Sequence, residues 1–539
     1  MHDYVLSGRE AKWYTVAVSV MATQASAITF ISLPGQAYVD GMRFVQSYLG
    51  LPLAMVILCI VAIPMYHRLN VLTAYEFLEK RFDLKTRTLA ASLFLLQRSL
   101  AAAISIYAPS IVLSIIMGWN VSYVIFVIGV LVVLYTTTGG TRAVSWAQSY
   151  QMAIITLGMV SVGFLVVYSM PKDVTFSDAL RVAAFSGKLN TIDFTFDLNN
   201  KYTFWSGLIG GLFLQMSYFG TDQSQVQRYL SGESVTQSRL GLLFNGMMKI
   251  PMQFGILFIG AMMFVFYQFT TPPLFFNQAE VAKLNGTRYE AEYKRLAEDF
   301  EKASNVRSVR LRALTTAVNS GNEDSKQAIS QELATNATEL ATLKAKAQAL
   351  LKENDPKAAT NDTNYIFLTF VINHLPTGLV GLLIAVVFSA SMSSASSEIN
   401  ALASTTIVDL YKRLFQGSLS EARSVWVMRW ATVIWGAIIV GFAQFMGSLG
   451  SLIEAVNKVG SLFYGAILGI FMAAFFLKKA SGHAVFVAAL LTEIIIFSLN
   501  YFTDIAFLWY NLIGCALVLV LALALSPLFP FAPQNNKAP

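Results

Sequence analysis

The segment from Phe388 to Lys412 reads FSASMSSASSEINALASTTIVDLYK and follows an apolar run that begins near Leu379. Five serines fall within seven residues of it, directly before Glu398: Ser391, Ser393, Ser394, Ser396 and Ser397. On a helix, serines four residues apart lie on one face. Inside a membrane each hydroxyl or carboxylate costs free energy unless a partner satisfies it. The oxygens therefore indicate either a bound, desolvated cation such as Na⁺ or close packing of small residues between helices.

The composition places this segment in a membrane protein. Of 539 residues, 55% are hydrophobic and 13% are charged, whereas a soluble chain carries roughly 25% charged residues. The net charge of +7 is modest, predicts no nucleic-acid partner and fits basic loops on one membrane face. Cys59 and Cys515 lie in apolar runs and the four histidines are scattered, so we expect neither a disulfide nor a cysteine or histidine metal site. Without a catalytic motif, the chain is predicted not to be an enzyme.

Apolar runs that are long enough to cross a bilayer recur about a dozen times. They are 13–37, 44–66, 89–117, 121–138, 146–169, 204–220, 242–269, 379–408, 424–446, 450–477, 483–499 and 505–526. Basic residues such as Arg68, Lys85 and Arg142 gather in alternate connections, whereas the short connection 118–120 has none. The positive-inside rule then puts both termini of this chain in the cytoplasm. We expect an all-α, multi-pass protein of the inner or plasma membrane.

A long polar segment interrupts the pattern of spans. We divide the chain into a first membrane part, an insertion and a second membrane part: 1–270, 271–364 and 365–539. Within the insertion, apolar residues recur at helical spacings over 289–300 and 329–350, with Asn336 in the seam of the second stripe. We predict an extracytoplasmic helical hairpin or a short coiled coil. It either packs on itself as a cap or offers a docking surface to an extracytoplasmic partner.

The first span contains small and polar residues where a simple spanning helix would be rich in leucine. It reads TVAVSVMATQASAITFISLPGQAYVDG from Thr15 to Gly41, with Pro34 and Gly35 in its second half. Unwound backbone at membrane depth is tolerated only where it lines a cavity, and its free carbonyl groups can then bind ions. The segment predicts either such an interrupted, ion-lining helix or a simple Pro/Gly kink without a ligand.

Five motifs occur in an order that resembles the sodium:solute symporter family. They are ATQASAITFISLPGQAY (Ala22–Tyr38), TAYEFLEKRF (Thr73–Phe82), YTTTGGTRAVSWAQSYQ (Tyr135–Gln151), GTDQSQVQRYL (Gly220–Leu230) and the serine-rich segment. The resemblance covers the chain outside the insertion. It implies a LeuT-like fold of two inverted five-helix repeats, with about 12 transmembrane helices. Members have one more helix before the segment that here begins at Asp3, so we expect a preceding helix to be missing from this chain.

The resemblance also implies a site for the coupling ion, Na⁺. The main sodium site of the family falls here on backbone carbonyls and hydroxyls of five residues: Ala22, Ala25, Ala390, Ser393 and Ser394. Neutral oxygens suit a hard cation. Some members bind a second sodium ion through two further serines, here Ser396 and Ser397, and an aspartate whose position is taken here by Gln148. We hypothesise that Glu398 supplies the missing carboxylate; the alternative is that Glu398 faces a neighbouring basic or polar group.

Substrate contacts of the family map onto four of the predicted spans and onto the segment directly after the span 204–220. They are Ser26, Thr29, Phe44, Gln46, Tyr48, Asp222, Gln223, Lys249 and Asn457. Members that carry sialic acid hold its carboxylate with an arginine at the position of Ala101, and Arg98 lies on the same helix face. Arg98 and Lys458 together would bind an anion, although Lys458 and Glu454 stand four residues apart and could instead neutralise each other. Lys249 either contacts the substrate or extends to the membrane surface.

We therefore expect a secondary active symporter that couples Na⁺ entry to uptake of a small polar organic solute by alternating access. The solute would be a sugar, a sialic acid or other sugar acid, or a carboxylate, and the lipid bilayer is the other partner. The alternative is a membrane sensor of solutes that has a transporter-like body and signals through the insertion.

Overall fold

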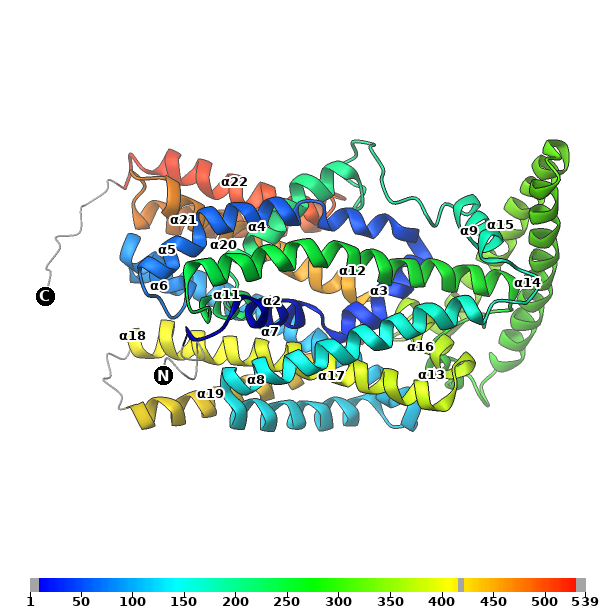
Figure 1. Ribbon diagram of the computed structural model, residues 1–539, viewed down its shortest axis with the longest axis horizontal. Helices are drawn as coiled ribbons and strands as arrows, with labels where there is room; N and C mark the ends of the chain where they lie inside the picture. Colours follow the sequence, from blue (N-terminus) through cyan, green and yellow to red (C-terminus); the bar gives the residue numbers. More distant parts are fainter. Residues whose placement is uncertain (1–8, 415–420, 530–539) are drawn as a thin grey trace, which may run out of the picture.

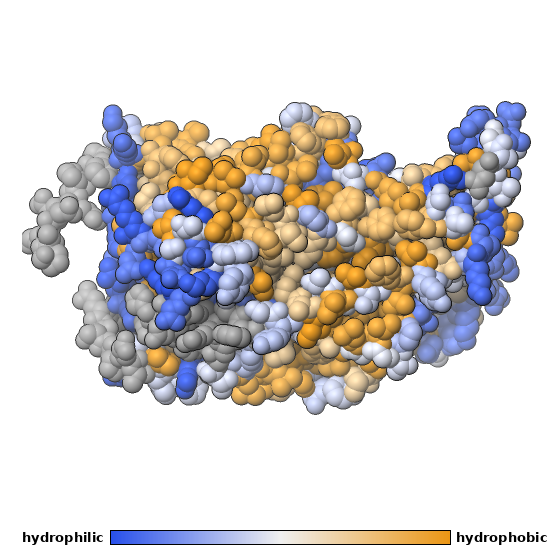
Figure 2. Space-filling model, in the orientation of Figure 1, coloured by the Kyte–Doolittle hydropathy of each residue, from blue (hydrophilic) through white to orange (hydrophobic). Residues whose placement is uncertain are grey.

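Figure 1 shows a computed structural model of the chain, which describes residues 9–414 and 421–529. In these residues ten helices are long and apolar enough to cross a membrane. They are Ala27–Arg68, Leu84–Met117, Val121–Thr138, Gln148–Tyr168, Val235–Phe269, Thr377–Tyr411, Arg423–Ala443, Leu452–Phe476, Gly482–Phe502 and Leu508–Leu525. Figure 2 shows apolar surface across the middle of the molecule and hydrophilic surface at both ends. The predicted all-α, multi-pass architecture is confirmed.

The first half of the chain forms the elements α2 (Trp13–Gln24), α3 (Ala27–Asp40), η2 (Gly41–Tyr48), α4 (Leu51–Ile60), α5 (Ala62–Arg68), α6 (Ala74–Arg81), α7 (Leu84–Met117), α8 (Val121–Tyr168), α9 (Phe176–Phe185), η3 (Ser206–Gly210), α10 (Gly211–Gly220), α11 (Gln223–Leu230) and α12 (Val235–Phe269). The second half forms α13 (Gln278–Ala282), α14 (Glu290–Asn319), α15 (Glu323–Asn354), α16 (Thr363–His374), α17 (Thr377–Thr405), η4 (Thr406–Tyr411), α18 (Lys412–Leu414), α19 (Glu421–Ala443), η5 (Met446–Ser448), α20 (Leu452–Phe476), α21 (Gly482–Phe502) and α22 (Leu508–Leu525).

Two of the helices are interrupted at membrane depth. The first break lies between α2 and α3, where Ser26 has an extended backbone and caps α3. The second lies between α10 and α11, where the Asp222 carboxylate accepts a hydrogen bond of 2.9 Å from the backbone N–H of Ser224. Pro34 and Gly35 lie inside α3, so the break precedes the kink residues of the sequence. Because of these breaks, α2 and α10 are too short to count as spans. In addition, α3, α4 and α5 form one continuous run, Ala27–Arg68. The structure therefore has ten spans among the described residues, where the sequence predicted about twelve.

The serine-rich helix α17 occupies the middle of the bundle and packs against α8, α7, α19 and α2. Many of its hydroxyls are satisfied by its own backbone. Ser391 donates to the carbonyl of Val387 at 3.0 Å, and Ser397 donates to the carbonyl of Ser393 at 2.9 Å. Such bonds allow polar residues to remain buried between helices without a ligand. Packing and ion binding are therefore compatible roles for different serines of this helix.

The insertion forms a helical hairpin of α14 and α15 at the end of the molecule away from the termini (Figure 1). Its seam contains Phe300 and Leu340, and the Asn336 side chain donates to the carbonyl of Ala303 at 3.0 Å. Two ion pairs join the hairpin to the rest of the chain: Arg312 with Asp173 at 2.6 Å and Lys344 with Asp362 at 3.0 Å. The hairpin is thus anchored on the membrane part as well as packed on itself.

Candidate functional site

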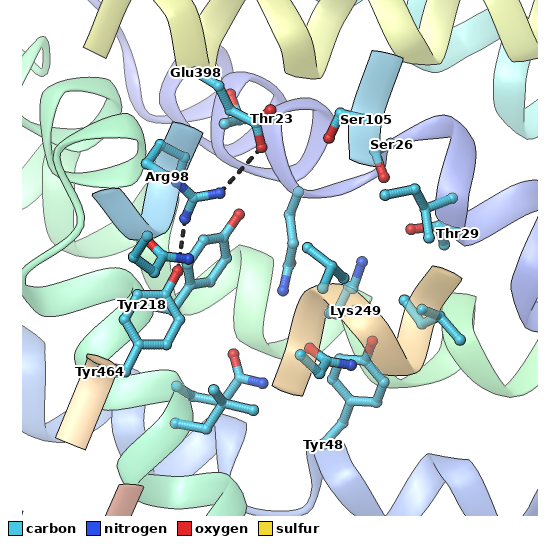
Figure 3. A pocket seen from close by; sticks show the side chains of 18 residues that line it. Thr23, Ser26, Thr29, Tyr48, Arg98, Ser105, Tyr218, Lys249, Glu398 and Tyr464 are labelled. Carbon is cyan, nitrogen blue, oxygen red and sulfur yellow. Dashed lines mark hydrogen bonds and ion pairs between the residues drawn. The ribbon is translucent and has the colours of Figure 1, made fainter. Parts of the chain in front are cut away.

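A cavity of about 90 Å³ lies between the two helix breaks (Figure 3). Its wall draws on the α2–α3 region, η2, α7, α10, α12, α17 and α20. Six predicted substrate residues line it: Ser26, Thr29, Tyr48, Arg98, Lys249 and Asn457. The breaks explain why segments far apart in the sequence meet here, because each leaves room and backbone polar groups beside the cavity.

Arg98 is the centre of a buried charge cluster in this wall. Its guanidinium forms ion pairs with Asp222 and, at 3.0 Å, with Glu398, and it donates to the Tyr464 hydroxyl at 2.6 Å. Tyr464 in turn donates to Asp222 at 2.9 Å, and the ring of Tyr218 lies 5.3 Å from the guanidinium carbon. Arg98 is 3% exposed. One cation thus faces two carboxylates from other helices, and its charge is already compensated within the protein.

Lys249 differs from Arg98 in having no such compensation. It is 1% exposed, lines the cavity and forms no ion pair with any carboxylate in the described part of the chain. Its ammonium lies 5.9 Å from the centre of the Tyr48 ring. The Tyr48 hydroxyl accepts a hydrogen bond of 3.1 Å from Gln253. A buried ammonium beside a cavity, without a carboxylate partner, is suited to binding an anionic group of a solute.

Amide side chains complete the polar wall. Gln24, Gln97 and Gln215 line the cavity, and the side-chain carbonyl oxygen of each is buried without a hydrogen-bond partner among the described residues. A buried polar atom without a partner costs free energy. A solute with hydroxyl or water-bridged groups would satisfy these oxygens on binding.

The five residues of the predicted main sodium site lie at the junction of α2 and α17. The Ser393 hydroxyl donates to the carbonyl oxygen of Ala22 at 3.2 Å, which brings two of the predicted ligands from different helices into contact. The Ser394 hydroxyl donates to the carbonyl of Ala390 at 2.9 Å, so two more share one turn of α17. Ala25 lies at the break itself. The described residues hold no cluster of His, Cys, Asp or Glu for a metal, and neutral oxygens of this kind fit Na⁺.

Of the four residues of the predicted second ion site, only Gln148 and Ser397 come into contact with each other. Gln148 hydrogen-bonds Ser397 at 2.9 Å, and Ser396 donates to the carbonyl of Ser393 at 3.1 Å. Glu398 points away from them and pairs with Arg98 (Figure 3). The structure thus favours the alternative in which Glu398 faces a basic group, because the buried guanidinium attracts the carboxylate more strongly than neutral hydroxyls do.

The other predicted substrate residues have structural partners outside the cavity wall. Gln46 donates to the carbonyl of Tyr202 at 2.8 Å, and Gln223 donates to the carbonyl of Leu72 at 3.0 Å. The ring of Phe44 packs 5.1 Å from that of Tyr202. Asp222 does not line the cavity and contacts its wall through Arg98 and Tyr464.

Lys458 and Glu454 do not neutralise each other as the i,i+4 spacing suggested. Lys458 is exposed, whereas Glu454 pairs with Lys201 at 2.9 Å and accepts a hydrogen bond of 2.6 Å from Tyr202. Partners from a distant loop therefore override the helical spacing, and Lys458 lies outside the cavity wall.

Seven polar residues of the wall were in neither the predicted substrate set nor the predicted ion sites: Thr23, Gln24, Gln97, Ser105, Gln215, Tyr218 and Tyr464. A sequence signal existed for the glutamines, since uncharged amides inside predicted spans are costly unless partnered. No comparable signal marked the tyrosines.

Known proteins resemble this chain in sequence. A model of the sodium:solute symporter family matches residues 4–302 and 342–491. The chain is 27% identical over 469 residues to the human sodium-coupled monocarboxylate transporter 1, covering 87% of this chain and 63% of that protein. It is 25% identical over 543 residues to the sodium/sialic acid symporter SiaT of Proteus mirabilis, covering 99% and 90%. The chain therefore spans less than two thirds of the human relative's length.

A solved structure shows the same fold. A Na⁺-coupled sialic acid symporter in a substrate-bound, outward-open state superposes with a TM-score of 0.74 at 24% sequence identity, covering 99% of this chain and 93% of that chain. This likeness confirms the predicted LeuT-like fold.

Proposed function

Because the chain belongs to the sodium:solute symporter family, we propose that it couples the entry of Na⁺ to uptake of a small organic anion, in particular a monocarboxylate. The family comprises transporters rather than enzymes. The observation that carries the proposal is the buried Lys249 in the cavity wall, which forms no ion pair among the described residues. The human relative is named for monocarboxylates and the bacterial relative for sialic acid, so both names include an acid.

Sodium would bind where α2 and α17 meet. The Ala22 carbonyl and the Ser393 hydroxyl, 3.2 Å apart, come from the two elements that a bound cation would join. Ala25, Ala390 and Ser394 would supply the remaining oxygens. The cation thereby stabilises the arrangement of the α2–α3 break, and that break also presents Ser26 to the cavity. Ion binding would in this way prepare the solute site.

The sum of buried charges supports one sodium ion with one monovalent anion. Arg98 and Lys249 carry two positive charges, and Asp222 and Glu398 carry two negative charges. Adding one Na⁺ and one carboxylate keeps the site neutral, whereas an anion alone would leave a net charge in a low-dielectric interior. Solute binding would therefore depend on sodium binding for an electrostatic reason.

The size of the cavity favours a small acid over a sugar acid. A volume of about 90 Å³ corresponds to roughly three water molecules at the volume each occupies in the liquid, which matches a carboxylate with few carbon atoms. The carboxylate would bind the Lys249 ammonium. A hydroxyl group on the solute would hydrogen-bond the unpartnered oxygens of Gln24, Gln97 or Gln215.

Uptake into proteoliposomes tests the proposal. Radiolabelled lactate, galactose and sialic acid would be supplied in sodium chloride or in choline chloride. We expect uptake of lactate in sodium only. Lys249→Met should raise the KM for lactate on the order of tenfold or more, because the variant loses a charge-assisted hydrogen bond to the carboxylate. The exposed Lys458→Met on α20 is the matched control and should leave the KM unchanged. Equal uptake in choline, or a preference for galactose, would refute the proposal.

A further inference from the structure

Gln148 lies in the middle of the bundle and joins three helices through its side-chain amide. It extends from α8 and is fully buried. Its carbonyl oxygen accepts a hydrogen bond of 2.7 Å from Ser19 of α2. Its nitrogen donates to Thr23 of α2 at 3.1 Å and to Ser397 of α17 at 2.9 Å, and the carbonyl oxygen of Ser393 lies 3.5 Å away.

The oxygens around this nitrogen have their own hydrogens directed elsewhere. The Thr23 hydroxyl donates to the carbonyl of Ser19 at 2.8 Å, and the Ser397 hydroxyl donates to the carbonyl of Ser393 at 2.9 Å. Their lone pairs are therefore left for the amide nitrogen. The nitrogen is thus surrounded by two hydroxyl oxygens and one carbonyl oxygen, the neutral oxygens that also bind a hard cation.

The amide satisfies this environment without a net charge. Among the described residues, no hydrogen bond or ion pair brings a carboxylate to the cluster, and the nearby Glu398 pairs with Arg98. An N–H group and a sodium ion place positive charge at the same point, but the amide needs no counter-ion in a low-dielectric interior. The hydrogen bonds also join α2, α8 and α17 without a bound ion.

We propose that the Gln148 amide stands in for a second coupling ion, so that a single sodium ion accompanies each solute. The inference rests on the sodium coupling proposed above and adds the stoichiometry. Gln148 acts as a positioning residue next to the main ion site, because Ser393 offers its hydroxyl to Ala22 and its carbonyl to the amide. With a monocarboxylate as solute, transport of one sodium ion would be electroneutral.

The isosteric change Gln148→Glu tests this assignment. A carboxylate oxygen in place of the nitrogen would face three oxygen lone pairs, a repulsion that a bound cation removes. In equilibrium binding of radioactive sodium, we expect one ion per purified wild-type chain and two per Gln148→Glu chain. The melting temperature of this variant should also become strongly sodium-dependent, which loss of a structural contact alone would not produce. Gln151→Glu, one turn further along α8, is the matched control and should bind one ion.

A transport measurement gives an independent readout. Using lactate in proteoliposomes, wild-type uptake should show a Hill coefficient for sodium near one and no response to an inside-negative potassium diffusion potential. Gln148→Glu should show a coefficient above one and a response to potential.

The outcomes separate this inference from the proposed function. Two ions bound by the wild type, or one ion bound by folded Gln148→Glu, would overturn the inference. A wild-type protein that binds no sodium would overturn sodium coupling itself. If Gln148→Glu fails to fold in any buffer, the wild-type count and its response to potential decide.

Discussion

The hydroxyl of Ser393 donates a hydrogen bond to the carbonyl oxygen of Ala22, 3.2 Å away on a helix that is separated from it by 371 residues of sequence. This contact joins the end of α2, next to its break, to the serine-rich helix α17. Neither atom carries a charge, and both are oxygens that a hard cation accepts as ligands. The contact therefore marks the place where ion binding and the position of the broken helix depend on each other.

Ser393→Ala should weaken sodium coupling. Loss of one ligand oxygen to a cation should raise the sodium concentration for half-maximal lactate uptake on the order of tenfold, equivalent to about 1.4 kcal/mol. The measurement is the sodium dependence of initial uptake rates in proteoliposomes. Ser391→Ala is the control, because that hydroxyl bonds only the carbonyl of Val387 within its own helix. Equal shifts in the two variants would show that Ser393 is not an ion ligand.

Arg98→Met should destabilise the protein strongly. The change leaves Asp222 and Glu398 buried without their cation, and removing one partner of a buried ion pair costs about 3–5 kcal/mol. A clear fall in the melting temperature of the purified protein is expected. The double variant Arg98→Met with Glu398→Gln should recover part of the lost melting temperature, because one of the two unpaired buried carboxylates is then neutral.

The ion pair between Arg98 and Glu398 also predicts how a change at Glu398 affects sodium binding. Glu398→Gln should leave the number of bound sodium ions unchanged, because the carboxylate faces Arg98 and not the Gln148 cluster. Sodium binding to the purified variant measures this number. If the variant bound fewer sodium ions than the wild type, Glu398 would be a sodium ligand after all.

The melting temperature of the protein should depend on pH through Lys188. This lysine lies in the loop between α9 and η3, with its ammonium 4.5 Å from the Phe264 ring. The pKa of Lys188 is lowered to about 8, mainly by burial; Asp40 opposes this shift, and Arg307 and Arg43 contribute to it. Because the unfolded chain holds this proton up to a pKa of about 10.4, folding is penalised below about pH 8. The penalty is relieved as the pH rises from there towards the unfolded value.

Lys188→Met removes this dependence while keeping an apolar side chain against Phe264. The variant should melt at a higher temperature than the wild type at pH 7, and the difference should narrow by pH 9.5. The control is Lys172→Met, at an exposed lysine in the connection between α8 and α9; the same comparison at pH 7 and pH 9.5 should not show this narrowing. If the difference in melting temperature between Lys188→Met and the wild type were the same at pH 7 and pH 9.5, the pH dependence would not come from Lys188.

The order of motifs sufficed for the family and the fold, but not for the partners of the charged residues. Arg98 was expected to bind the solute because its spacing from Ala101 places it on the right helix face. Its actual partners, Asp222 and Glu398, lie 124 and 300 residues away in sequence. The same holds for Glu454, which pairs with Lys201 and not with its helical neighbour. Helical periodicity predicts which face a residue occupies, whereas ion pairs between helices depend on the packing of the whole bundle.

The family resemblance placed Ala22 and Ser393 in one sodium site; the structure shows these two residues in contact, and the sodium site itself stays a prediction. Ala22 and Ser393 belong to motifs of fixed local geometry, a helix break and a serine cluster, so their contact follows from the fold. The glutamines of the wall come from separate helices, and only the assembled structure shows that Gln24, Gln97 and Gln215 converge.

Gly35→Ala tests the close approach of α3 and α16. A Cβ atom on Gly35 would lie 2.0 Å from the backbone carbonyl oxygen of Thr363, a contact that no side-chain rotation relieves. The two helices would have to separate, and overpacking of this kind costs about 1–3 kcal/mol. We expect a lower melting temperature and reduced uptake, because α3 carries Thr29 of the cavity wall.

Gly255→Ala in α12 is the matched control for this helix contact. A Cβ there meets nothing within 4 Å, and alanine favours a helix over glycine by up to about 1 kcal/mol. Its melting temperature should therefore stay the same or rise. If Gly35→Ala were as stable as Gly255→Ala, the two helices would not be in backbone contact, and α3 would be free to move without α16. A fall in the melting temperature of Gly35→Ala alone would show that the backbones of α3 and α16 are in direct contact, as the position of Thr363 requires.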